Sequence, residues 1–205
     1  MATIMELDGV GPSIGEGVFL APTAVLVGDV RVGDRANVWF GAVLRGDSSR
    51  IEIGAECSIQ DNAVIHCADD LPTVIGDRVV VGHGALLEGC VIEDGALIGM
   101  GAIVLQHARV GAGALVAAGA VVPERAEIAP GVLAAGVPAA VRRRLSGSAL
   151  AWTQSVADRY QGYGRRYLSC GRVLEDAGAG SPQPGREAGR PPVPEPLPSG
   201  LPPRA

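Results

Sequence analysis

An aliphatic residue recurs every six positions through most of the first 122 residues of this chain. The members of the series are Ile14, Leu20, Leu26, Val32, Val38, Leu44, then Ile53, Ile59, Ile65, then Ile75, Val81, Leu87, and finally Ile92, Ile98, Val104, Val110, Val116 and Val122. A period of six fits neither an α-helix nor a simple strand, whose side chains repeat every 3.6 and 2 residues. It is typical of hexapeptide repeats, in which each hexad forms a short strand and a turn, and three hexads close one triangular coil. The sequence therefore predicts an all-β solenoid, a parallel β-helix.

The composition suits a narrow solenoid interior. Hydrophobic residues make up 47% of the chain, yet aromatic residues make up only 3%. The apolar content is therefore mainly Ala, Val, Ile and Leu, which stack well inside a narrow prism that has little room for rings. The 30 glycines favour the tight turns that such coils need.

The six-residue phase breaks at three places. The segment Gly46–Arg50 reads as an insertion or bulge, Cys67–Val74 as a loop, and a smaller slip falls near Val91.

The pattern divides the chain into three parts. Residues 1–145 are predicted to form the β-helix, and residues 146–172 a helix that packs on it. In this helix Trp152, Val156, Tyr160, Tyr163 and Tyr167 recur at spacings of three and four. Residues 173–205 are rich in Pro, Gly and Arg, a composition that predicts a disordered tail.

Charge and composition exclude several classes of function. The net charge of −5, with 17 Arg and no Lys, argues against nucleic-acid binding. No apolar run approaches about 20 residues, so no membrane span is expected. Met1–Pro12 lacks the features of a secretory signal. The four cysteines have neither disulfide nor zinc-finger spacing. Cys57 and Cys90 fall on the small-residue or turn positions of hexads, so we expect small core or turn residues there, and a cytoplasmic protein.

Grouping the hexads by three places polar side chains in columns. Arg45, His66 and Glu88 each follow an inward aliphatic residue, so they should stack on one outer face, about 4.8 Å apart per coil. Gln60 and His83 follow the neighbouring face, so His83 should lie around a corner from the His66 and Glu88 column. A neighbouring chain in a closed ring, most naturally a homotrimer, could bring the three side chains together.

Five segments resemble the γ-class carbonic anhydrase family. They are Phe40–Asp47 (FGAVLRGD), Ser58–His66 (SIQDNAVIH), Val81–Cys90 (VGHGALLEGC), Leu97–Leu105 (LIGMGAIVL) and Gly136–Leu145 (GVPAAVRRRL). The resemblance covers roughly residues 10–168. It implies a left-handed β-helix and a homotrimer in which a metal-bound hydroxide hydrates CO2 reversibly to bicarbonate.

In that family three histidines from two subunits hold a divalent metal, usually Zn2+, at the subunit interface. By resemblance His66 and His83 match two of these ligands. Glu88 stands where the family has the third histidine. A carboxylate is a competent zinc ligand, and Fe2+ or Co2+ would also suit a site of His and carboxylate.

The resemblance also implies roles for residues around the metal. Arg45 and Asp47 match residues that form interface ion pairs and handle bicarbonate. Gln60 and Asp61 match the pair that orients metal-bound water, and Tyr160 matches a C-terminal active-site tyrosine.

Glu88 leaves the function open between three alternatives. An anionic ligand should raise the pKa of metal-bound water, which family-type catalysis needs near 7, against about 9 for aqueous zinc. The chain is therefore either a γ-carbonic anhydrase-like enzyme, weak because of Glu88, or a non-catalytic trimeric scaffold or accessory subunit. The third alternative is a hexapeptide acyltransferase that uses acetyl-CoA with a histidine as general base.

Overall fold

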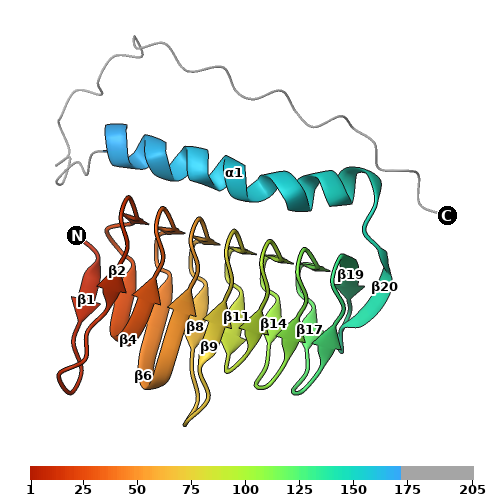
Figure 1. The fold of residues 1–205 in the computed structure, drawn as a ribbon, viewed down its shortest axis with the longest axis horizontal. Helices are drawn as coiled ribbons and strands as arrows, with labels where there is room; N and C mark the ends of the chain where they lie inside the picture. Colours follow the sequence, from red (N-terminus) through yellow and green to blue (C-terminus); the bar gives the residue numbers. More distant parts are fainter. Residues whose placement is uncertain (172–205) are drawn as a thin grey trace, which may run out of the picture. The chain divides into compact units, whose positions relative to one another are not determined.

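The computed structural model describes residues 1–171 of the chain, and these residues form a three-sided β-helix followed by one helix (Figure 1). Twenty short strands precede the helix α1 (Gly147–Cys170). Within residues 1–171 neighbouring coils pair through parallel strands, and β20 is the one strand there that runs antiparallel to its neighbour. The predicted fold class, a left-handed parallel β-helix with a C-terminal helix, is confirmed. The predicted disordered tail at 173–205 lies outside the described residues.

The strands stack into three faces, which we call A, B and C. Face A consists of β1 (Thr3–Met5), the first halves of β4 (Val25–Val32) and β6 (Val43–Ile53), β8 (Val64–His66), β11 (Leu86–Glu88), β14 (Ile103–Val104) and β17 (Val121–Val122). Face B consists of β2 (Ser13–Ile14), the second halves of β4 and β6, β9 (Thr73–Ile75), β12 (Val91–Ile92), β15 (Arg109–Val110) and β18 (Glu127–Ile128). Face C consists of β3 (Phe19–Leu20), β5 (Asn37–Val38), β7 (Ser58–Ile59), β10 (Val80–Val81), β13 (Leu97–Ile98), β16 (Leu115–Val116), β19 (Val132–Ala135) and β20 (Ala140–Arg144).

The core is the inward column of each face. On face A the register aligns Leu44 with Ile65 and Ile65 with Leu87, and these three side chains are at most 2% exposed. Small residues such as Ala63 and Ala85 fill the next inward position and are fully buried. The alternation of a large and a small inward residue allows each coil to repeat the last, which explains the dominance of Ile, Leu, Val and Ala.

The corner between faces B and C is tight enough to require glycine. At Gly54 and Gly76 an added Cβ would lie within 3 Å of atoms of the next coil. Acidic side chains then close the corner, because Asp77 Oδ1 accepts the amide of Ala55 at 2.7 Å and Asp94 Oδ1 accepts that of Asp77 at 2.9 Å. These residues link coils by hydrogen bonds where the strand ladder is interrupted.

The breaks in the repeat fall between faces A and B. In the pairing of β4 with β6, Gly28 aligns with Gly46 and Val30 with Ile51, so β6 bulges outward over the intervening residues. The second break is shorter than the sequence suggested. We expected a loop over Cys67–Val74, but β9 begins at Thr73, because Thr73 and Val74 pair with β6. The slip near Val91 occurs at Gly89 and Cys90, between β11 and β12.

Helix α1 runs back along the prism (Figure 1) and packs on face C. Val156 and Ala157 contact Val80 and Leu97, and all four side chains are buried. Toward the end of the helix Tyr160, Tyr163 and Tyr167 join Phe19 and Trp39 in an aromatic cluster. The helix is therefore held by an apolar face, as the spacing of its aromatic residues predicts. Among residues 1–171, no helix combines the length and apolarity required to cross a membrane.

The stacked core makes Ile65 a sensitive position. We expect Ile65→Ala to lower the free energy of unfolding by about 2–5 kcal/mol, because adjacent coils hold the walls of the resulting cavity apart. Urea denaturation at fixed protein concentration measures the change. Val141→Ala, at an exposed position of β20, is the control and should change the free energy by less than about 0.5 kcal/mol. Equal losses in the two variants would contradict this account of the core.

Candidate metal centre

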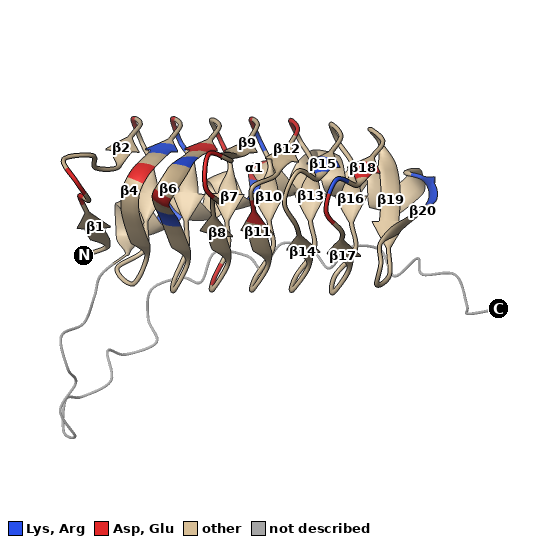
Figure 2. Cartoon of the chain, turned by 90° about the horizontal axis from the view of Figure 1, so that it is seen from below, with Lys and Arg blue, Asp and Glu red and all other residues tan. Residues whose placement is uncertain are grey.

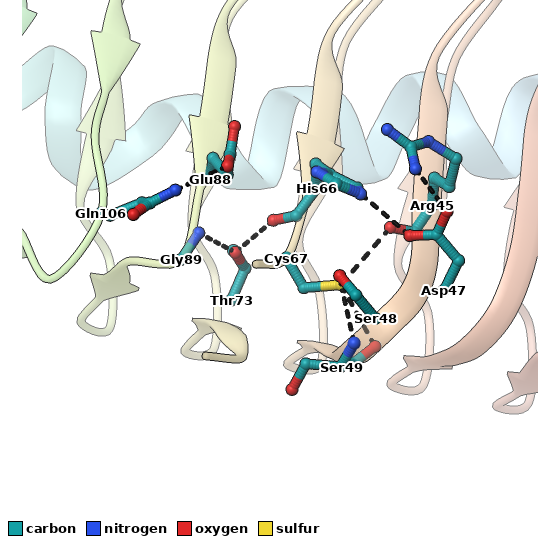
Figure 3. A network of polar contacts seen from close by, with 10 residues as sticks. All are labelled: Arg45, Asp47, Ser48, Ser49, His66, Cys67, Thr73, Glu88, Gly89 and Gln106. Atoms are coloured by element: carbon teal, nitrogen blue, oxygen red, sulfur yellow. Dashed lines mark hydrogen bonds and ion pairs between the residues drawn. The ribbon is translucent and has the colours of Figure 1, made fainter. Parts of the chain in front are cut away.

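Arg45, His66 and Glu88 form a column on the outside of face A. His66 pairs in register with Arg45 on one side and with Glu88 on the other. Each follows a buried core residue, so strand alternation turns its side chain outward. Figure 3 shows the three side chains along successive coils. The stacking predicted from the repeat is therefore present.

Asp47 links Arg45 to His66. It comes from the bulge in β6, and its Oδ1 lies 2.9 Å from His66 Nε2, while Oδ2 forms an ion pair with Arg45. The hydrogen bond with His66 and the nearby Arg45 lower the pKa of the Asp47 carboxyl group, against a smaller opposing effect of burial. Asp47 is therefore an anion at neutral pH, able to orient the imidazole of His66.

Glu88 has one neighbour that the sequence did not suggest. Gln106 Nε2 donates a hydrogen bond of 2.8 Å to Glu88 Oε1 (Figure 3). No other hydrogen bond to the Glu88 carboxylate occurs within residues 1–171. The neutral amide orients the carboxylate without neutralising its charge. The contact could have been found from the sequence, because Gln106 lies 18 residues, or one coil, beyond Glu88.

His83 lies in the turn between β10 and β11, at the corner of faces C and A. Its Nδ1 is 2.8 Å from Asp61 Oδ2, and its backbone amide donates to Gln60 Oε1 at 3.1 Å. The hydroxyl of Tyr160, from helix α1, lies 3.5 Å from His83 Nε2. Burial, together with the nearby Tyr163 and Asp61, raises the pKa of Tyr160, so this hydroxyl keeps its proton at neutral pH.

The two histidines share a local arrangement. Each imidazole contacts a carboxylate through one ring nitrogen, Asp47 in the case of His66 and Asp61 in the case of His83. Histidines that bind metals usually donate their second ring N–H to a carboxylate or carbonyl in this way, which fixes the tautomer and raises the basicity of the ligand nitrogen.

A single chain does not bring both histidines together. His83 lies before the start of β11 and Glu88 is the last residue of that strand, while His66 pairs with Glu88 from the neighbouring coil. Within the described part of the chain, the one group of three metal-ligand side chains with atoms within 4.8 Å of one another is Asp47, His66 and Cys67. Cys67 is fully buried, and its sulfur accepts a hydrogen bond from the Ser49 amide at 3.2 Å. We therefore assign Cys67 to the packing of the core beneath the bulge in β6.

An apolar cavity of about 500 Å³ adjoins His83. Gln60, His83 and Tyr160 line its polar end, and Leu115, Trp152, Val156 and neighbouring residues line the remainder. Helix α1 therefore forms one wall of the cavity beside His83.

Known proteins share the repeat and the fold of this chain. Residues 11–46 and 89–124 match the family model "Bacterial transferase hexapeptide (six repeats)". The repeat and the three-sided coil define the chain as a hexapeptide-repeat β-helix protein. A hexapeptide transferase family protein from Anaplasma phagocytophilum, of known crystal structure, is 37% identical with a TM-score of 0.78, covering 81% of this chain and 98% of its own.

Two further relatives are named carbonic anhydrases, which indicates the family within the hexapeptide-repeat proteins. A "Probable carbonic anhydrase" of Methanocaldococcus jannaschii is 48% identical over 72% of this chain and 92% of its own length. "Gamma carbonic anhydrase 2, mitochondrial" of Arabidopsis thaliana is 43% identical over 54% of this chain. The chain belongs to the γ-carbonic anhydrase-like family of hexapeptide-repeat proteins. It spans only 44% of the length of that plant relative.

The cysteines provide a test of the site's surroundings. Burial raises the pKa of the Cys57 and Cys90 thiols to about 12, and Cys67 is also fully buried. Cys170 is exposed. We expect a thiol reagent such as dithionitrobenzoate to label one cysteine per folded chain and all four after denaturation, because the thiolate is the reactive form. Rapid labelling of Cys57 or Cys90 in the folded protein would contradict the described packing.

Proposed function

We propose that this protein catalyses the reversible hydration of CO2 to bicarbonate, at a metal site shared between neighbouring copies in a homotrimer. The observation that carries the proposal is the pair of histidines, each with a carboxylate on one ring nitrogen, at the two opposite edges of face A. Membership of the γ-carbonic anhydrase-like family supports it.

The residues present fit a divalent metal. His66 and Glu88 are neighbours in register and offer one imidazole and one carboxylate, and His83 of another copy would complete a set of three. Zinc accepts such mixed nitrogen and oxygen ligands and keeps a further position for water or substrate in catalytic sites. We propose Zn2+, with Fe2+ or Co2+ as alternatives. When bound, the metal would supply Lewis acidity that makes water a nucleophile at neutral pH.

The surrounding side chains would bind and orient the reactants. Arg45 is an exposed cation beside His66. It pairs with Asp47 and would also bind the bicarbonate anion. Gln60 and Asp61 hold the turn and imidazole of His83 and would orient water there. The protonated Tyr160 hydroxyl lies beside His83 Nε2, the ring nitrogen left for the metal, and would donate a hydrogen bond to bicarbonate there.

The outer side of face A supports the association of copies. Val43, Val64, Leu86, Ile103 and Val121 align in one column. Val64 and Leu86 are 36% and 43% exposed, and β14 and β17 carry no charge (Figure 2). A continuous apolar stripe of this kind marks an interaction surface. Because it runs beside His66 and Glu88, another copy bound there would approach the proposed metal site.

Leu86 tests the trimer. We expect Leu86→Glu to reduce the mass measured by light scattering from three chains to one, because each copy would bury an unpaired charge at the interface. Metal retention should fall with it. Leu168→Glu is the matched control at an exposed leucine of α1 and should leave the mass unchanged. A wild-type monomer that retains metal fully would exclude a shared site.

Glu88 decides how strong the activity is. A carboxylate ligand gives the metal less residual positive charge than an imidazole, so it raises the pKa of bound water. Each unit of increase removes about nine tenths of the reactive form at neutral pH. Glu88 therefore favours a weak anhydrase.

Replacement of Glu88 separates its effects on metal retention and rate. We expect Glu88→Ala to lose metal, and Glu88→His to retain it and to increase CO2 hydration about tenfold, which corresponds to one unit of pKa. Metal analysis and stopped-flow hydration measure the two effects. Glu127→Ala, on β18 of face B, is the control. If Glu88→His changes neither quantity, Glu88 is not the determinant and a scaffold role becomes the better proposal.

An acyltransferase is the second candidate, because the relative from Anaplasma phagocytophilum is named a hexapeptide transferase family protein. In that case His66 or His83 would serve as a general base, and the protein would release free CoA from acetyl-CoA in the presence of an acceptor. Turnover of acetyl-CoA without CO2 hydration would favour this candidate.

A further inference from the structure

Thr73 connects the strand that carries His66 to the strand that carries Glu88. It is the first residue of β9 and is fully buried. Its Oγ1 donates to the carbonyl oxygen of His66 at 2.5 Å and accepts the amide of Gly89 at 2.7 Å. Figure 3 shows this hydroxyl between the two peptide groups.

Both peptide groups occur where the six-residue phase breaks. His66 is the last residue of β8, after which the chain leaves the coil. Gly89 follows Glu88 at the slip between β11 and β12, is buried, and has a φ of +56°. An added Cβ there would lie 2.5 Å from Leu71 Cδ2, so a larger residue would require the Leu71 side chain to move. Buried backbone groups need hydrogen-bond partners, and at this corner a side chain satisfies both of them.

The consequence concerns the proposed ligands. His66 and Glu88 stand on adjacent coils, and a metal held by both requires a fixed relation between their backbones. We infer that Thr73 is a positioning residue for the metal centre, whose hydroxyl fixes the backbone of His66 relative to that of Glu88. The inference rests on the proposed function, since it assigns Thr73 to the same site. Thr73 has no contact with either ligand side chain among its hydrogen bonds, so its role is to orient them through the main chain.

The experiment is titration of the full-length trimer with Co2+ in competition with a chelator. Thr73→Val keeps the shape of the side chain and removes both hydrogen bonds. We expect Co2+ affinity to fall about 10–100-fold, the usual effect of losing a residue that orients metal ligands. The visible absorption of bound Co2+, which depends on coordination geometry, should change as well. Thr73→Ser retains the hydroxyl and should restore both affinity and spectrum.

Thr153→Val is the matched control, because Thr153 is also buried and donates to a backbone carbonyl, within α1. It should leave Co2+ affinity and spectrum unchanged. Wild-type affinity in Thr73→Val, or failure of Thr73→Ser to restore it, would overturn the inference. Absence of Co2+ binding by the wild-type trimer would instead overturn the proposed function, and this inference with it.

Thr73→Ala guards against misfolding of the valine variant, since the smaller side chain cannot overpack the corner. Light scattering and circular dichroism establish that each variant keeps the trimer and the strands. If neither variant folds, Thr73 is a determinant of the prism itself and the positioning role is overturned.

Discussion

The hydrogen-bond ladder between successive coils is the constraint on which the rest of the structure depends. It holds each strand about 4.8 Å from the next and keeps residues of equal position in line, as Leu44, Ile65 and Leu87 are. Because the inward positions repeat, a narrow core of aliphatic side chains can continue along the prism without large rings. Because the outward positions repeat as well, any chemistry on the surface must be arranged in columns.

The candidate metal centre uses these columns. Arg45, His66 and Glu88 occupy one column, and Gln60, Asp61 and His83 gather at the adjacent corner. The width of face A separates the two groups within one chain, so the proposed site requires a second copy. In the proposed assembly, association and metal binding would be linked: loss of the interface would remove a ligand from the metal, and loss of the metal would remove one of the contacts between copies.

The interruptions of the repeat serve the site more than the fold. The bulge in β6 supplies Asp47 to His66, and the loop after β8 leaves space in which the Thr73 hydroxyl meets two main-chain groups. Glu88 stands where the family resemblance implies a third histidine, and Gln106 supports that carboxylate with a neutral donor. In the proposed site this carboxylate would leave the metal less positive charge than a third imidazole would, and so would lower its reactivity toward water.

The sequence by itself determined the solenoid, because a six-residue period fits neither an α-helix nor a simple strand. It also determined that Leu26, Leu44, Ile65 and Leu87 stack in one column. It also predicted the outward column of Arg45, His66 and Glu88, since strand alternation follows directly from the core positions. Only the tertiary structure decided which carboxylate contacts which imidazole, because bulge and turn geometry set the reach of Asp47 and Asp61. The start of β9 at Thr73, two residues earlier than the hexads suggested, and the contacts of Gln106 arise in the same way. They depend on how one coil closes against the next, which a local period does not encode.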